Sequence, residues 1–209
     1  MTPPTPTPTP QPDLRQTSQA CLRNREPIGD ALTPLLREGD LVFELGAGTG
    51  QHAVDFAGRF PFVTWQPADR PENHPSIAAW RDFAGLPNLL PVLGFDLFDE
   101  TAPLAKADLV LAINVLHIAP EPASRHLFRH AARLLGPGGL VVVYGPFRYP
   151  DRELEPSNVE FERWLQSVDP ARGLREVTTL DGYAAAHGFA FEGDLALPAN
   201  NHLRWWRKG

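Results

Sequence analysis

The chain has 209 residues, 43% of them apolar, and a formal net charge of −6. This length suits one α/β domain, and the acidic balance argues against a dedicated nucleic-acid binder, which usually carries a basic surplus. The single cysteine, Cys21, excludes an internal disulfide and a cysteine-based metal site. Because no apolar run reaches the ~20 residues of a bilayer span and no signal-peptide pattern opens the chain, we expect a soluble, cytoplasmic protein without a membrane partner.

Residues 1–13 are predicted to be a disordered, Pro/Thr-rich tail, and residues 14–209 a single domain. The tract TPPTPTPTPQP has no apolar face and few amide donors, which favours a solvated, extended chain over a proline-rich recognition ligand. A first helix is predicted over 26–38, with Pro27 in its first turn, Gly39 after its end and a possible kink at Pro34.

Apolar runs then alternate with helical patterns. Strands are predicted at 41–45, 62–66, 89–93, 108–113, 140–144, 189–195 and 202–206, and helices at 50–59, 75–84, 121–135, 158–167 and 178–187. Such alternation is typical of an α/β, Rossmann-like fold with helices on both faces of a seven-stranded, mostly parallel sheet. The last two strands are separated only by PANN and should form an antiparallel C-terminal hairpin at one edge. In LLGPGGLVVVYG we expect a helix end, a tight turn and a strand.

The loop after the first strand reads ELGAGTG, with Gly46, Gly48 and Gly50 in alternation. Glycine at every second position suits close approach of a ligand to the backbone. The dinucleotide fingerprint would need its third glycine where Gln51 stands, and a phosphate-binding loop would need a lysine. A tight turn without any ligand is the simpler alternative.

Polar residues follow the next strands in the same way. Asp69 lies about 20 residues after the glycine loop, where an acidic side chain binds ribose hydroxyls, although it could instead cap the next helix. Asp96 in GFDLFD is either a ligand contact or an ordinary turn aspartate. His117 in NVLH is either a neutral base for a substrate hydroxyl, thiol or amine, or only a wall of the site.

These motifs resemble those of class I S-adenosylmethionine-dependent methyltransferases. RNREPIGDAL, GTGQHAVDFA, TWQPAD, NVLHIAP, YGPF, PSN and LPANN further resemble the methyltransferase-like 26 type, domain of unknown function family 938, over roughly 14–208. The resemblance implies the fold and S-adenosylmethionine as methyl donor, but not the acceptor. His117 is the candidate base on the chemistry of its imidazole. The candidate donor contacts are Asn24, Glu44, Gly46, Ala47, Gly48, Gly50, His52, Asp69, Arg70, Asp96, Leu97 and Asn114.

The segment 146–172 is long for a connection in this architecture, and we expect it to cover the substrate. Its arginines beside aromatic residues favour an anionic small molecule, unless they only pair with the neighbouring acids. The candidate substrate contacts are Phe147, Arg148, Tyr149, Arg152 and Asn158, with Ser157 beside them. His52 either faces the donor carboxylate or is exposed in the first turn of its helix.

Other polar and aromatic residues are assigned simpler roles. His126 and His130 are four residues apart but lack a third ligand, so we expect no metal and interpret them as a surface pair. Trp205 and Trp206 should point to opposite faces of the last strand, one into the core and the other to a dimer surface or a charge-guarded edge. The protein is thus expected to be a monomer or homodimer.

We therefore expect methyl transfer from S-adenosylmethionine to an oxygen, sulfur or nitrogen nucleophile of a small molecule. The first alternative is a protein that binds this donor without methyl transfer, in a regulatory role or for cyclisation or elimination chemistry. The second is a nicotinamide-dependent oxidoreductase, against which Gln51 argues.

Overall fold

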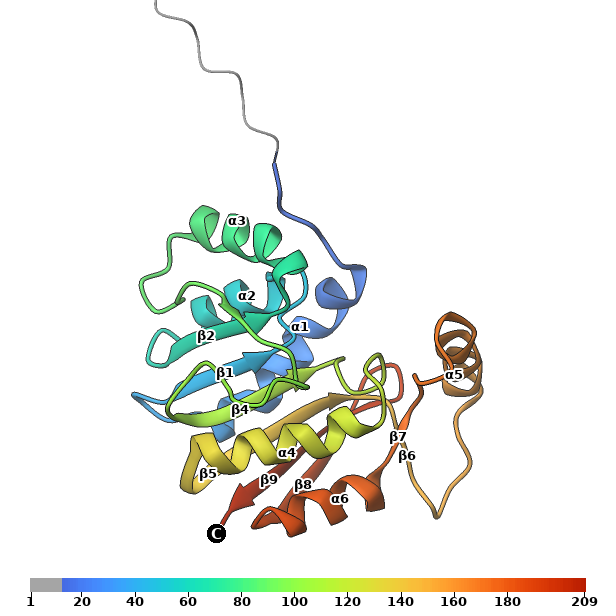
Figure 1. The fold of residues 1–209 in the computed structure, drawn as a ribbon. Coiled ribbons are helices and arrows are strands. Elements are labelled where there is room, and N and C mark those ends of the chain that lie inside the picture. Colours follow the sequence, from blue (N-terminus) through green and yellow to red (C-terminus); the bar gives the residue numbers. More distant parts are fainter. Residues whose placement is uncertain (1–12) are drawn as a thin grey trace, which may run out of the picture.

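A computed structural model describes residues 13–209 and places one seven-stranded sheet at their centre (Figure 1). The strand order is β3-β2-β1-β4-β5-β9-β8; β1 to β5 are parallel, and β9 runs antiparallel to both of its neighbours. This confirms the predicted fold class. The strands are β1 (Leu41–Leu45), β2 (Thr64–Asp69), β3 (Leu93–Gly94), β4 (Ala107–Ile113), β5 (Leu135–Gly145), β8 (Phe189–Leu197) and β9 (Asn201–Lys208).

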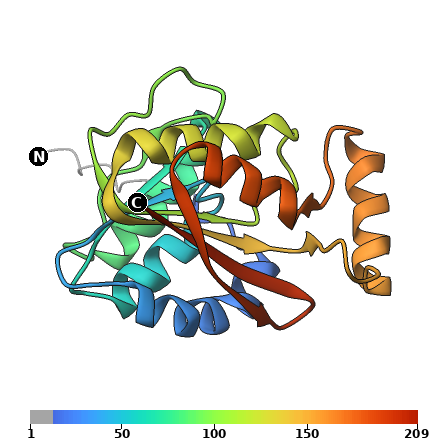
Figure 2. The same cartoon turned by 90° about the horizontal axis from the view of Figure 1, so that it is seen from below.

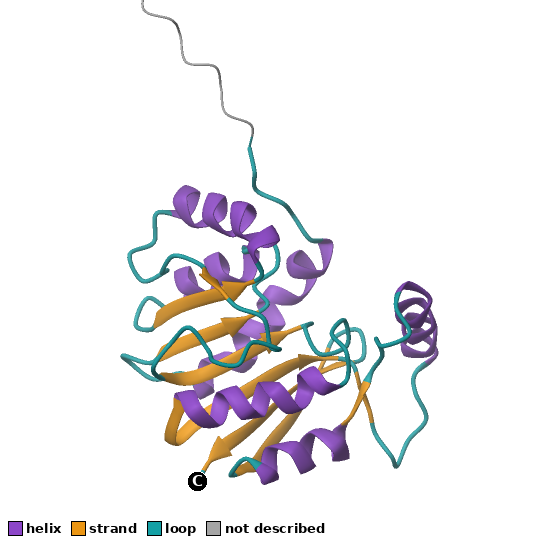
Figure 3. Ribbon diagram, viewed as in Figure 1, coloured by secondary structure: helices purple, strands orange, loops and turns teal. Residues whose placement is uncertain are grey.

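Helices cover both faces of the sheet (Figure 3). Val42 of β1 packs in one apolar cluster with residues of α1 (Gln19–Leu32) and α2 (Gln51–Arg59), and α3 (His74–Ala84) lies beside α2. The adjacent Phe43 packs in the other cluster, with residues of α4 (Pro122–Leu134) and α6 (Val177–Ala186). Neighbouring side chains of a strand point to opposite faces, so an uninterrupted apolar run supplies both layers of the core.

One helix, α5 (Pro156–Val168), lies away from both faces of the sheet, beyond the carboxyl end of β5 (Figure 2). It is connected through β6 (Phe147–Arg148) and β7 (Arg175–Glu176), which pair with each other in a small parallel sheet. The sequence did not predict this pair, because two-residue strands leave no periodicity to detect. The segment expected to cover the substrate therefore stands at the edge of the sheet where ligands of this architecture bind.

Several predicted boundaries are corrected. The first helix begins at Gln19 with Pro27 inside it, ends at Leu32 and continues only as the short turn η1 (Thr33–Leu35). β2 is shifted toward the C-terminus, and β3 has only two residues, since Leu89 makes just an isolated bridge to Trp65. A second short turn, η2 (Pro71–Asn73), precedes α3.

The Gly/Pro stretch after α4 is not a separate turn. It belongs to β5, whose pairing with β4 jumps from Leu135 opposite Ala107 to Leu140 opposite Leu109, so the extra residues bulge. The prediction of a disordered tail falls mainly on residues 1–12, which lie outside the described residues; Asp13 is described and pairs with Arg15.

The C-terminal hairpin is confirmed, with Ala199 and Asn200 both in the left-handed region at its turn (φ 59° and 55°). Trp206 is fully buried against α4, and Trp205 packs partly buried against the opposite cluster. The guarded-edge interpretation of residues 202–206 is wrong, because β9 is an inner strand and β8 forms the edge. In the described part of the chain, residues 13–209, no helix is both apolar and long enough for a membrane span.

Candidate functional site

Two cavities meet at the carboxyl ends of β1 and β4, where the strand order reverses direction. The larger has a volume of about 990 Å³ and the smaller about 450 Å³. Gly46, Gly48, Asn114 and Ile118 line both. Such a switch point is where open α/β sheets bind their ligands, and the elongated space suits a ligand with two chemically different halves.

The glycine loop forms the boundary between the cavities. Gly46 and Gly48 have φ values of 68° and 58°, and a Cβ on Gly46 would lie 2.6 Å from Val115 Cγ2. Gly50 also has a positive φ, 89°, but in the described chain it lines neither cavity, and a Cβ there would lie 2.8 Å from the Cα of Ile77. The expected ligand contact of Gly50 is therefore corrected: this glycine lets the start of α2 pack closely against α3.

Asp69, at the end of β2, lines the smaller cavity and braces the glycine loop. Its Oδ2 accepts a hydrogen bond from the Gly48 amide (2.6 Å), and its Oδ1 accepts from the Arg70 amide (2.7 Å) and Asn73 Nδ2 (2.9 Å). A carboxylate offers about four lone-pair positions, so a free acceptor position remains for a ligand hydroxyl. The Arg70 side chain lines the same cavity, is largely exposed and pairs with Glu72.

The far wall of the smaller cavity comes from the loop after β3. Asp96 accepts a hydrogen bond from the Phe98 amide (2.9 Å), so it is a turn aspartate that also lines the cavity, and the buried Leu97 adds an apolar surface. His126 and His130 both bond the Leu97 carbonyl oxygen, each at 3.1 Å. Their interpretation as a surface pair is wrong: His130 is fully buried, and both histidines hold this loop.

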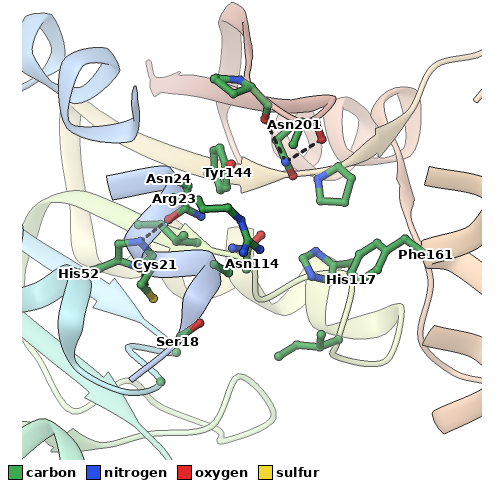
Figure 4. Close-up of a pocket in the computed structure, with 18 of the residues that line it drawn as sticks. Ser18, Cys21, Arg23, Asn24, His52, Asn114, His117, Tyr144, Phe161 and Asn201 are labelled. Carbon is green, nitrogen blue, oxygen red and sulfur yellow. Dashed lines mark hydrogen bonds between the residues drawn. The ribbon is translucent and has the colours of Figure 1, made fainter. Parts of the chain in front are cut away.

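The larger cavity has a polar end formed by α1 and α2. His52 Nε2 lies 2.8 Å from Asn24 Oδ1, and both side chains line the cavity (Figure 4). Burial lowers the pKa of His52 to about 4, so this imidazole is neutral at physiological pH and its Nε2 donates to Asn24. The alternative of an exposed first-turn histidine is wrong. Cys21 Sγ lies 3.6 Å from the other ring nitrogen, Nδ1.

Arg23 and Asn114 complete this polar end. Figure 4 shows the Arg23 guanidinium reaching across the cavity toward Asn114. Among residues 13–209 the Arg23 side chain has no hydrogen-bond or ion-pair partner, which leaves its charge available to a ligand. Asn114 follows β4 with its backbone in the left-handed region (φ 58°), and its backbone N–H donates to the Tyr144 carbonyl oxygen (2.9 Å). A non-glycine residue held there is common at functional sites.

His117 lies where the polar end meets an aromatic wall. It is 6% exposed, and burial, with Arg175 nearby, lowers its pKa to about 4. Its ring packs edge-on against Phe161, with 5.3 Å between centroids, and glycine at position 145 leaves it room, since a Cβ there would lie 3.3 Å from Nδ1. No described residue hydrogen-bonds either ring nitrogen, so the neutral imidazole is free to accept a proton.

Of the five predicted substrate contacts, only Asn158 lines the larger cavity, with Ser157 beside it. The predicted substrate contacts of the other four residues are corrected, because within the described chain these residues line neither cavity. Phe147 is core, Arg148 pairs with Glu162, Tyr149 donates to Asp194, and Arg152 lies over the Tyr149 ring. These side chains find their partners elsewhere in the folded chain, and sequence spacing gave no sign of those partners.

The predicted donor contact of Glu44 is also corrected. This residue lines neither cavity in the described chain, is almost fully buried, and accepts a hydrogen bond from Trp65 Nε1 at 2.7 Å. Burial raises the pKa of this carboxyl to about 7. Glu44 thus links β1 to β2 inside the sheet, just before the glycine loop.

Other lining residues had no assigned role in the sequence interpretation, because α1, α5 and the hairpin turn meet only in the folded chain. The spacing of Phe161 and Trp164 on a helix was the one available signal. Across residues 13–209, no three His, Cys, Asp or Glu side chains cluster as a metal site would require. The lining residues not chosen as contacts include Cys21, Arg23, Tyr144, Phe161, Trp164 and Asn201.

The strand order and the position of the site define the fold of class I methyltransferases. Solved structures with this fold include an O-methyltransferase family protein from Burkholderia thailandensis, with a TM-score of 0.77 and 21% identity over 91% of this chain and 57% of that one. The mitomycin 7-O-methyltransferase MmcR matches with a TM-score of 0.78 and 19% identity, over 91% of this chain and 54% of its own. Human N-acetylserotonin methyltransferase, solved in complex with SAM, matches with a TM-score of 0.73 and 21% identity, over 91% of this chain and 53% of its own.

This chain therefore spans little more than half the length of these proteins. It belongs to the family described as Protein of unknown function (DUF938), whose model matches residues 15–208.

Proposed function

We propose that this protein transfers a methyl group from S-adenosylmethionine to a small molecule. The observation that carries the proposal is the joining of two cavities at the glycine loop, Asn114 and Ile118. The smaller cavity suits the adenosine half of the donor, and the larger has space for the methionine half together with an acceptor. Human N-acetylserotonin methyltransferase, which shares the fold, has been solved with SAM.

The residues present fit this donor. Asp69 is proposed to accept hydrogen bonds from the ribose hydroxyls, Asp96 to bind the adenine amino group, and Leu97 to pack on the ring. Asn114 lies at the methionine end, where Arg23, which has no partner among residues 13–209, suits the carboxylate. Further donor contacts are proposed for the lining residues Asn24, Gly46, Ala47, Gly48, His52 and Arg70.

The bound donor supplies a methyl group on a positively charged sulfur, which is already a good leaving group. In the transfer, a bond forms between the acceptor heteroatom and the methyl carbon, and the carbon–sulfur bond breaks with its electron pair going to sulfur. The acceptor proton passes to the neutral His117 ring. The protein's main contribution is to align the acceptor with the methyl group and exclude water. A base with a pKa of about 4 assists only while the new bond forms.

The acceptor site lies in the larger cavity, beside His117, Asn158 and Phe161. An anionic acceptor was expected from Arg148 and Arg152, but Arg23 is the arginine that reaches this space. Because Arg23 is assigned to the donor carboxylate, no predicted arginine contact is left to favour an anionic acceptor over a neutral one. The methyltransferase-like 26 type, a monomeric or homodimeric state and a cytoplasmic location remain predictions.

Donor binding is tested by calorimetric titration of the purified protein with S-adenosylhomocysteine and, separately, with NAD. We expect saturation by the first and none by the second. Stabilisation gives an independent readout, since a ligand at 100 times its Kd raises the free energy of unfolding by about 2.7 kcal/mol. Saturation by NAD alone would contradict the proposal. Isotope-labelled methyl recovered in a product would separate transfer from binding without transfer.

A further inference from the structure

The larger cavity has two chemically different walls. Arg23, Asn24 and Asn114 form the polar wall next to the glycine loop. The α5 wall carries two aromatic side chains, Phe161 and Trp164, next to the polar Asn158. The polar wall is accounted for by the methionine half of the donor, but the aromatic wall has no role in donor binding.

α5 is fastened at two points that present this wall to the cavity. Near its start, Asn158 Nδ2 donates to the Asn200 carbonyl (3.3 Å), and Asn200 Nδ2 donates to Ser157 Oγ (3.1 Å). One turn later, Glu162 accepts hydrogen bonds from Arg148 and from the Leu174 amide. These contacts tie the helix to the hairpin turn and to β6, so it stands over the cavity without packing on the sheet.

The two aromatic rings lie against each other at the cavity, and the indole of Trp164 remains largely exposed. Phe161 and Trp164 stack nearly parallel, with 5.7 Å between centroids and 17° between planes, and His117 meets Phe161 edge-on. Trp164 is 55% exposed although it lines the cavity. An exposed indole offers a large apolar face to a ligand, and tryptophan is enriched at binding interfaces.

We propose that Trp164, supported by its contact with Phe161, stacks on the ring of a planar aromatic acceptor whose hydroxyl faces His117. This inference rests on the proposed methyl transfer and names its acceptor class as phenolic. The phenol oxygen would bond to the methyl carbon, its proton would move to the imidazole, and the products would be an aryl methyl ether and S-adenosylhomocysteine. A phenol, with a pKa near that of tyrosine at about 10, gives up its proton to a weak base more readily than an aliphatic alcohol does.

The test is calorimetric titration of the protein, saturated with S-adenosylhomocysteine, with 2-naphthol, catechol and 4-nitrophenol, and with cyclohexanol as the saturated-ring control. At least one phenol should saturate the site, and cyclohexanol should bind at least about tenfold more weakly, a difference of about 1.4 kcal/mol. Trp164→Ala and Phe161→Ala should each weaken the phenol about tenfold, and Trp164→Phe should restore most of the affinity.

Val168→Ala is the matched control, because Val168 is exposed on the same helix but does not line the cavity. It should leave phenol binding unchanged, and none of these variants should alter the affinity for S-adenosylhomocysteine. The inference is overturned if no phenol saturates the site, if cyclohexanol binds equally well, or if Trp164→Ala behaves like Val168→Ala. Absence of S-adenosylhomocysteine binding would instead refute the proposed function itself.

Discussion

The donor half and the acceptor half of the site are built in different ways. The donor half consists of loops that directly follow β1, β2, β3 and β4, and its key side chains stand within a few residues of a strand end. The acceptor half joins His117 after β4, the helix α5 and the β8–β9 turn, which are far apart in the chain. A binding site made by consecutive strand ends is encoded locally, whereas one made by distant segments depends on how those segments pack.

The largest expected effect concerns the buried support of the donor half. Burial raises the pKa of Glu44 from 4.5 to about 7, so between these pH values the folded protein holds a proton that the unfolded chain releases. The stability contribution of this group therefore falls as pH rises. Glu44→Gln keeps an acceptor for Trp65 and removes the charge. Relative to wild type, the variant should gain up to about 3 kcal/mol between pH 4.5 and 8, because each pKa unit is worth about 1.4 kcal/mol.

Urea unfolding at both pH values measures this difference. Because His52 and His117 are present in both proteins, their own titration cancels in the comparison. Exposed Glu38→Gln is the control variant. If Glu44→Gln changes the free energy of unfolding equally at the two pH values, the pKa of the Glu44 carboxyl is not raised in the folded protein.

The next largest effect should be at Asp69. Asp69→Ala removes the acceptor for the ribose hydroxyls and for the Gly48 amide, so the affinity for S-adenosylhomocysteine should fall about 100-fold, as expected for two hydrogen bonds to a charged group. Asp69→Asn should lose less, and Asp82→Ala, an exposed carboxylate on α3, should lose nothing. Calorimetry measures all three, and a loss under threefold in Asp69→Ala would remove Asp69 from the donor site.

Arg23 tests the border between the two halves. Arg23→Gln should weaken S-adenosylhomocysteine about tenfold, since a charge-assisted hydrogen bond contributes roughly 1.5–3 kcal/mol. Binding of methylthioadenosine, which lacks the amino acid, should stay unchanged. The neighbouring Arg25 pairs with Asp55, 3.3 Å away, and Arg25→Gln serves as the control. If Arg23→Gln weakens both ligands equally, the guanidinium does not bind the carboxylate.

The smallest effect is expected at Arg152, which the sequence placed at the substrate. Its guanidinium lies 3.8 Å from the centre of the Tyr149 ring, outside the cavity. Arg152→Gln should change the affinities for S-adenosylhomocysteine and for a phenol by less than about twofold, as for other surface substitutions. A tenfold loss of either ligand would show that the 149–153 segment closes over the site when it is filled.

The sequence by itself determined the mostly parallel seven-stranded sheet with its antiparallel C-terminal hairpin, the glycine loop and the polar residues at the ends of β2, β3 and β4. Those features follow from local apolar patterns and from residues adjacent to strand ends. Only the tertiary structure decided that Arg23, Phe161, Trp164 and Asn201 meet at one cavity and that Arg148 and Arg152 point away. The physical reason is that the position of α5 depends on long-range hydrogen bonds, such as Asn158 to Asn200, which leave no periodic trace in the chain.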